Sequence, residues 1–179
     1  MSRPVCLVTG SSSGIGAAIV EQFAAQGYDV VVNYNSGADR AEQIAPESTR
    51  IPYGVSKAGL NHAVVGAAFD GGPYNITVNA LRPGVIDTPL TSRPSGVEDP
   101  ATGREFTVAD TYGLMAEGGA QPIRRIGQPD DIAFAAYAFT QIPYMTGQLI
   151  AVDGGFTLPG NFPNRELFLQ EGLRKRQEQ

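Results

Sequence analysis

Apolar runs and a helical period alternate along the first part of the chain. Residues 4–9 form a short apolar run, typical of a parallel strand that is covered on both faces. Residues 14–26 then repeat apolar residues on one helical face, and Gly27 follows where a glycine caps a helix end. Residues 28–34 are another valine-rich run. This order of strand, glycine turn, helix and strand predicts a right-handed crossover unit, which opens a doubly wound α/β sheet.

The remainder of the chain predicts further elements with irregular stretches between them. Residues 35–52 have no strong period and carry prolines and serines, which indicates a loop with at most one helical turn. Residues 94–119 are polar and contain glycines, which resembles a mobile substrate lid more than a scaffold element. Regular elements are expected at residues 53–69 (helix), 75–81 (strand), 130–140 (helix, with Pro129 at its start) and 147–153 (strand).

The carboxyl-terminal residues 161–179 leave two alternatives open. Apolar Leu167, Phe168 and Leu173 suit an amphipathic helix, but the basic and polar residues around them suit a solvated, fraying tail equally well. A length of 179 residues is enough for one compact domain with a real core and too short for two. We therefore expect one domain over residues 1–160, followed by a tail over 161–179.

Composition narrows the classes of function. Apolar residues make up 42% of the chain and charged residues 17%, as in an ordinary folded protein. A formal charge of -5 without a basic run in the body of the chain argues against a nucleic-acid partner, and no apolar stretch is long enough to span a membrane. The single cysteine, Cys6, fits a small buried hydrophobic residue and a reducing compartment. We expect a cytoplasmic protein that binds a small molecule and no metal.

A glycine-rich motif lies between the first predicted strand and helix. Residues 9–16 read Thr-Gly-Ser-Ser-Ser-Gly-Ile-Gly. Glycines let the backbone turn tightly and approach a pyrophosphate, while the amides and positive end of the helix attract its charge. In this context the motif predicts dinucleotide binding, and the alternative is a plain turn from strand to helix.

A second motif combines a phenol with an ammonium group. Tyr53 and Lys57 are four positions apart, so they are neighbours on one face of the predicted helix. A phenol with an ordinary pKa near ~10 is a poor acid at neutral pH, and a positive charge beside it favours the ionised form. The pair therefore predicts acid/base chemistry, although the same spacing also occurs by chance on surface helices.

Together, and in this order, the two motifs resemble the short-chain dehydrogenase/reductase family, in particular 3-oxoacyl-carrier-protein reductase-like members. Residues 79–88, 125–131 and 146–155 also resemble segments of that family. The resemblance implies a Rossmann-like doubly wound parallel sheet in a three-layer α/β/α arrangement. It also implies an NAD(P)-dependent oxidoreductase, which transfers a hydride between a nicotinamide cofactor and a carbonyl or secondary alcohol substrate.

The resemblance assigns roles to individual residues. It implies that Tyr53 exchanges a proton with the substrate oxygen, and that Lys57 holds the cofactor ribose and lowers the pKa of the tyrosine. Asn33 and Tyr34 stand where an acidic residue would favour NAD, so NADP is expected and NAD is the alternative, although Ser13 is not the basic residue that many NADP-using members carry. The cofactor-binding residues that the resemblance implies are Gly10, Ser12, Ser13, Gly14, Ile15, Gly16, Asn33, Tyr34, Tyr53, Lys57, Pro83, Gly84, Val85, Ile86 and Thr88.

The sequence departs from the family pattern in its middle. Family members place three more strands, with their helices, between the second strand and the tyrosine helix, whereas this chain has only residues 35–52 there. The absent part would include the catalytic serine, and Ser48 is too close to Tyr53 along the chain to replace it. We expect a fold that lacks about three central strands, in which either the first strand pairs directly with the strand at 75–81 or the chain is unstable alone.

Two functions therefore stay open: an oxidoreductase impaired by the missing segment, or a noncatalytic remnant that acts as a cofactor-binding or oligomerisation module. In the family the tyrosine helix packs against its mate, so the resemblance also implies a homo-oligomer that self-associates through residues 53–69. His62, on the same helix, suits a structural or interface role better than a proton relay. Asp153 suits a hydrogen-bonding residue at a strand end better than a base.

Overall fold

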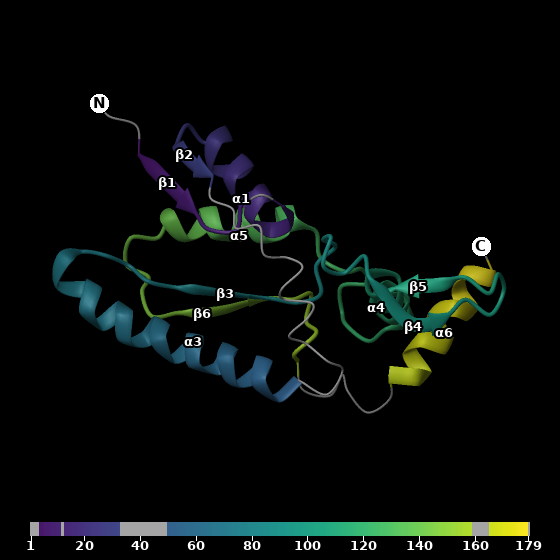
Figure 1. Ribbon diagram of the computed structural model, residues 1–179. Coiled ribbons are helices and arrows are strands. Elements are labelled where there is room, and N and C mark those ends of the chain that lie inside the picture. The colour runs from purple at the N-terminus through teal and green to yellow at the C-terminus, as the bar shows by residue number, and fades with distance from the viewer. Residues whose placement is uncertain (1–3, 12, 33–49, 159–164, 179) are drawn as a thin grey trace.

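The fold opens with the predicted crossover unit, which consists of β1 (Val5–Val8), α1 (Gly14–Ala25) and β2 (Asp29–Val32). β1 and β2 pair in parallel over their whole length. Gly27 follows α1 with a φ of +84°, a left-handed conformation that glycine adopts without strain. The order of strand, turn, helix and strand is confirmed. The computed structural model describes residues 4–11, 13–32, 50–158 and 165–178 (Figure 1).

Helices lie on both sides of a second parallel pair, β3 (Ala80–Pro83) with β6 (Leu149–Val152). α5 (Pro129–Thr140) lies on the same side as α1 and packs against it, and α3 (Arg50–Gly71) lies on the opposite side (Figure 1). The helix expected to begin at Pro129 is confirmed. The arrangement is a truncated Rossmann-like α/β fold with parallel strands between two helical layers.

The β1–β2 and β3–β6 pairs are separate sheets, and no strand among the described residues joins them. Direct pairing between the first strand and the strand near residue 80, one of the two expected outcomes, is therefore not formed. Val5 and Leu7 of β1 are 67% and 65% exposed, so the expectation that residues 4–9 are covered on both faces is wrong. The physical reason is that the chain holds only residues 35–52 where further strands and helices would supply the cover.

A second group of elements packs around its own apolar core. Its core residues are Phe106, Leu114, Met115, Ala120 and Leu169. The expectation that residues 94–119 resemble a mobile lid more than a scaffold element is therefore wrong. The group consists of the antiparallel pair β4 (Pro94–Glu98) and β5 (Glu105–Thr107), followed by α4 (Val108–Gly118) and α6 (Arg165–Gln177).

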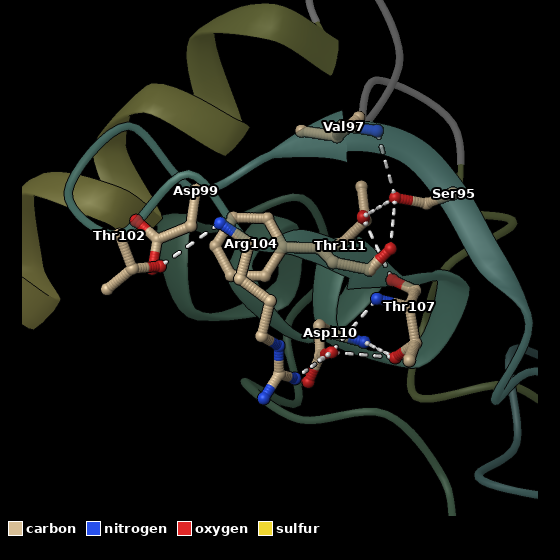
Figure 2. Close-up of polar contacts among 9 residues, drawn as sticks. Ser95, Val97, Asp99, Thr102, Arg104, Thr107, Asp110 and Thr111 are labelled. Atoms are coloured by element: carbon tan, nitrogen blue, oxygen red, sulfur yellow. Dashed lines mark hydrogen bonds and ion pairs between the residues drawn. The ribbon is translucent and has the colours of Figure 1, made fainter.

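The polar residues of this segment act as caps and cross-links. The Thr107 hydroxyl oxygen accepts a hydrogen bond from the Asp110 backbone N–H at 3.0 Å, and the Asp110 carboxylate accepts one from the Thr107 backbone N–H at 3.0 Å (Figure 2). The Thr107 backbone N–H and the Thr107 hydroxyl both donate to the Asp110 carboxylate, and they hold the pKa of Asp110 below its ordinary value. The Thr111 hydroxyl donates to Ser95 Oγ at 2.8 Å, and Ser95 donates to the Phe106 carbonyl at 2.8 Å. A polar pattern that indicated a lid therefore encodes a capped helix tied to a hairpin.

The carboxyl-terminal segment takes the helical alternative as α6, which packs on α4. Leu169 of α6 is 8% exposed and Leu114 of α4 is fully buried. The helices come so close that a Cβ on Gly172 would lie 2.1 Å from the Leu114 carbonyl oxygen, and a Cβ on Gly118 would lie 1.9 Å from the Phe168 carbonyl oxygen. Only glycine fits at these two crossing points. The domain boundary at residue 160 stays a prediction.

The largest differences from the expected boundaries are the first residues of α3 and β3. α3 begins at Arg50, inside the predicted loop, and Pro52 falls in its first turn, where the missing N–H costs no helical hydrogen bond. The strand expected from residue 75 begins at Ala80, because Asn75 takes a left-handed φ of +57° and the Val78 backbone N–H bonds to Thr146 Oγ1 instead of a ladder partner. No helix among the described residues is long and apolar enough to cross a membrane.

Candidate functional site

The turn between β1 and α1 requires its glycines. Gly10 and Gly14 have φ values of +67° and +55°, in the left-handed region. A Cβ on Gly16 would lie 2.3 Å from the Gly10 carbonyl oxygen, so the first turn of α1 sits directly against the preceding backbone. Ile15 lies half-buried between these glycines. The motif therefore forms a tight turn that exposes backbone, as a phosphate cradle requires.

The amino end of α1 has the charge character that an anion needs. Ser13 is the N-cap residue, yet its side chain makes no capping hydrogen bond, and the first turn holds no acidic residue. The unpaired N–H groups of a helix start carry partial positive charge. No acidic side chain in the described first turn of α1 would therefore repel a phosphate at the amino end of this helix.

The loop after β3 meets the glycine turn. A Cβ on Gly14 would lie 3.3 Å from Thr88 Cγ2 and 3.4 Å from Thr88 Cβ. The threonine side chain therefore packs directly against the glycine backbone. An open depression lies beside this contact. Its lining includes Gly14, Ala17, Glu21, Asp87, Thr88 and Pro129.

Thr91 holds that loop in shape. Its Oγ1 accepts a hydrogen bond from the Thr88 backbone N–H at 2.9 Å and lies 2.9 Å from the Ile86 carbonyl oxygen, to which it can donate. Ile86 is 5% exposed and forms a β-bridge with Gly127, just before α5. The loop is thus fixed both by its own side chains and by the segment that leads into α5.

The carboxyl ends of β3 and β6 form a cleft. Pro83 and Val85 line it with Phe156, and its volume of about 550 Å³ lies in the range of ligand pockets. A Cβ on Gly84 would lie 2.8 Å from Asp153 Cα, so glycine is required where the two strands end together.

Asp153 is a hydrogen-bonding residue at the end of β6, as expected. Its Oδ1 accepts from the Gly155 backbone N–H at 2.9 Å, and its Oδ2 accepts from the Thr157 hydroxyl at 2.6 Å. Burial raises the pKa of Asp153, but the hydrogen bonds from Thr157 and Gly155 outweigh that effect and hold the pKa below its ordinary value. The carboxylate therefore stays ionised and engaged, which does not suit a general base.

An ion pair fixes the start of α5 beside this site. The Arg125 guanidinium donates to both carboxylate oxygens of Asp131, at 2.7 and 2.9 Å. This hydrogen bonding, helped by the Gln128 backbone N–H, lowers the pKa of Asp131 to about 2. The arrangement ties the loop before α5 to its first turn.

The predicted acid/base pair lies in α3, on the other side of the β3–β6 pair from α1 (Figure 1). The backbone of Tyr53 belongs to the helix, and the side chain of Lys57 is exposed. His62 of the same helix is also exposed, and its structural or interface role stays a prediction. The structure thus joins the glycine turn to the loop after β3 but leaves α3 on a separate side.

Several predicted positions lie outside the described residues. These are Ser12, Asn33 and Tyr34, together with Ser48. Among the residues that the structure does describe, no group of histidine, cysteine and acidic side chains could hold a metal ion. Partial burial raises the pKa of the Cys6 thiol, which opposes its use as a nucleophile.

The sequence reasoning missed two residues that build the site. Thr91 was one, although a threonine three positions after Thr88 is a spacing at which hydroxyls bond local backbone. Gln121 was the other: it is 7% exposed, and its Nε2 donates to the carbonyl oxygens of Ile123 and Arg125. No periodic pattern in the sequence predicts the burial of Gln121, because this residue lies in an irregular segment.

Two family models match the chain. The model described as "short chain dehydrogenase" matches residues 4–51, and the one described as "Enoyl-(Acyl carrier protein) reductase" matches residues 39–157, more than half of the chain. The two matches meet in the region where the sequence is shorter than the family pattern.

Individual proteins agree with these matches. The chain is 30% identical to "Uncharacterized oxidoreductase YxbG" of Bacillus subtilis, over 79% of this chain and 50% of that protein. It is 30% identical to "3beta-hydroxysteroid dehydrogenase 1" of Eggerthella lenta, over 86% of this chain and 53% of that protein. The chain thus spans about half the length of these curated relatives.

The fold agrees as well. A solved small-chain dehydrogenase in complex with NADPH superposes with a TM-score of 0.63 at 20% identity, covering 87% of this chain and 99% of that one. At this identity the likeness concerns the fold alone.

Proposed function

The chain belongs to the short-chain dehydrogenase/reductase family, and from this premise we propose that it is an NADP-dependent oxidoreductase that acts on a carbonyl or secondary alcohol. The observation that carries the proposal is the packing of Thr88 against Gly14, which brings the glycine turn and the loop after β3 to one place. A plain turn from strand to helix would not account for this contact between two segments that are far apart in the sequence.

The described residues fit the phosphate end of a dinucleotide. Gly10, Gly14 and Gly16 form a turn in which side chains would clash or strain the backbone, and the start of α1 carries positive partial charge. The loop over residues 83–88 would border the nicotinamide half. NADP is favoured over NAD because Asn33 and Tyr34, which follow β2 in the sequence, stand in place of an acidic residue.

The proposed chemistry needs one proton donor and one orienting cation from the chain. In this proposal, the Tyr53 hydroxyl donates a proton to the substrate oxygen during reduction and takes it back during oxidation. Lys57, one helical turn further along, favours the ionised phenol and holds the ribose. The nicotinamide, when bound, supplies or accepts the hydride. The cleft at the carboxyl ends of β3 and β6 would receive the substrate.

The missing central segment limits the proposed activity. Loss of one oxyanion donor typically lowers a rate by roughly 100 to 1000-fold. We therefore expect slow turnover. We propose that the protein is cytoplasmic, because it has a single cysteine. We also propose that it is a homo-oligomer, because α3 exposes apolar residues.

The test has two steps because binding and turnover can be separated. The chain contains no tryptophan, so the intrinsic fluorescence of NADPH can be titrated with little protein background. NADPH oxidation is then followed with a panel of ketones and 3-oxoacyl thioesters, and Tyr53→Phe serves as the comparison. Binding with turnover that Tyr53→Phe abolishes supports the oxidoreductase. Absence of NADPH binding contradicts the proposal.

A second candidate is a noncatalytic module that binds the cofactor or a related subunit. It is favoured by the two separate parallel pairs and by a chain length about half that of the relatives. NADPH binding without turnover of any carbonyl would select this candidate.

A further inference from the structure

We infer that α6 is a positioning element for the dinucleotide site. It stabilises α4, and α4 together with the segment after it (residues 119–127) braces the loop over residues 85–93 at both ends. This inference rests on the proposed function for its ligand, but its structural part can be measured without any ligand.

The amino end of α4 is bonded to the loop. The backbone N–H of Val108 donates to the Arg93 carbonyl oxygen, and that of Ala109 donates to the Thr91 carbonyl oxygen, both at 2.9 Å. These are first-turn amides, which find no partner within their own helix. Thr91 is the residue that bonds Thr88, and Thr88 packs against Gly14. A continuous set of contacts therefore leads from α4 to the glycine turn.

The segment that follows α4 is bonded to the other end of the same loop. Gln121 follows the helix and holds the carbonyl groups of Ile123 and Arg125. Two residues later, the Gly127 backbone N–H donates to the Val85 carbonyl oxygen, and the Asp87 backbone N–H donates to the Gly127 carbonyl oxygen, both at 2.9 Å. α4 and the segment after it thus contact the loop on both sides of Thr88, α4 on the later side and Gly127 on the earlier side.

α6 provides the cover that α4 needs. Leu114 is fully buried and Met115 is 5% exposed, and Leu169 of α6 belongs to the same core. An amphipathic helix of this length is not stable in water without such packing. Without α6, the part of the apolar face of α4 that α6 covers would be in water, and Phe106 of β5 would be left in that core without Leu169.

Polar contacts add to this packing. The Lys175 ammonium donates to the Glu117 carbonyl oxygen at 3.1 Å, where α4 ends, and the Arg176 guanidinium donates to both oxygens of the Glu117 carboxylate at 3.2 Å. These cations neutralise the negative end of α4. Arg174, in contrast, pairs with Glu171 and Glu178 of its own segment.

Two glycines allow a matched experiment. A Cβ on Gly172 would lie 2.1 Å from the Leu114 carbonyl oxygen, whereas a Cβ on Gly113 of α4 would meet no atom within 4 Å. Gly172→Ala should therefore separate α6 from α4, and Gly113→Ala adds the same methyl group to the same helix pair without a clash.

The measurement is hydrogen exchange of the Asp87 and Thr88 amides in the full chain, followed by an NADPH fluorescence titration. We expect Gly172→Ala to accelerate exchange at both amides and to weaken NADPH binding about tenfold, within the usual range of coupling between sites. Gly113→Ala should change neither. Faster exchange within α6 without any change at Asp87 and Thr88 would overturn the inference.

Two further outcomes are also decisive. If Gly172→Ala fails to fold, by circular dichroism, Glu117→Gln takes its place, because it removes only the carboxylate that Arg176 contacts. Unchanged exchange at Asp87 and Thr88 in that variant, together with faster exchange in α6, counts against the inference. If the unaltered chain binds no NADPH, the proposed function fails, and the exchange data alone decide whether α6 positions the loop.

Discussion

Thr88 packs against the backbone of Gly14, with its Cγ2 3.3 Å from the place where a Cβ on that glycine would lie. The contact joins the start of α1 to the loop after β3. Each of these segments is unremarkable as a turn by itself. Their meeting beside the amino end of α1 forms an open depression, whose lining combines Gly14 and Thr88 with the acidic Glu21 and Asp87. The feature that suits a phosphate group is the partial positive charge at the start of the helix.

The first prediction concerns Gly16. Gly16→Ala would place a Cβ 2.3 Å from the Gly10 carbonyl oxygen, so the glycine turn must open. We expect NADPH affinity to fall at least about tenfold, since the amides that would contact the phosphates lose their arrangement. Fluorescence titration measures this. Gly66→Ala, in α3 and without atoms within 4 Å, is the matched control and should bind as the unaltered chain does.

The second prediction concerns Tyr53. Tyr53→Phe removes the proposed proton donor, and general acid–base catalysis contributes about 100 to 10,000-fold in rate. We expect NADPH oxidation with a reducible ketone to fall by that order while NADPH binding changes little. Tyr74→Phe, at a 76% exposed position, should leave both quantities unchanged. Equal turnover in Tyr53→Phe and the unaltered chain would remove Tyr53 from the mechanism.

The sequence predicted the periodic parts of this fold and missed the parts that long-range packing decides. α1 and α5 were predicted because an apolar face and a proline start are local features. The core beneath residues 94–119 was missed because Leu114 shares it with Leu169, which is far along the chain. No spacing of residues in the sequence predicts the contact of Gly14 with Thr88. The exposure of Val5 and Leu7 depends on the absence of covering strands and helices rather than on the sequence of β1 itself.

The third prediction tests that core. Leu114 is fully buried, so Leu114→Ala should lower the free energy of unfolding by about 2–5 kcal/mol through lost burial and a cavity. Urea denaturation followed by circular dichroism measures the change. Leu167→Ala, at a 60% exposed position of α6, removes the same atoms from the surface and should cost much less. Equal effects of both substitutions would contradict the packing of α6 on α4.

The fourth prediction concerns acid stability. The pKa of Asp131 is lowered to about 2 by the Arg125 guanidinium and the Gln128 backbone N–H, below the ordinary value of 3.8. A carboxylate whose pKa is lower in the folded state than in the unfolded state contributes its full stabilisation above about pH 3.8. That contribution is lost as the pH falls from 3.8 through about 2. The pair is partly exposed, so we expect no more than about 1 kcal/mol. Asp131→Asn should flatten the decline in unfolding free energy between pH 4 and 2 relative to Asp130→Asn.

The last prediction concerns self-association through α3. Val65 and Phe69 lie one helical turn apart and are 45% and 85% exposed, although both are apolar. Exposed apolar residues that share a helix face mark an interaction surface when they adjoin one another. If a second copy covers them, a lysine there must be desolvated or must force the copies apart. We expect Phe69→Lys to shift the chain towards monomer in sedimentation velocity experiments over a range of concentrations. Phe134→Lys, at a 67% exposed position of α5, gives the same change of charge on a different helix and should leave the sedimentation profile unchanged. If the unaltered chain sediments as a monomer throughout, or if Phe134→Lys dissociates it as strongly as Phe69→Lys does, α3 is not the interface.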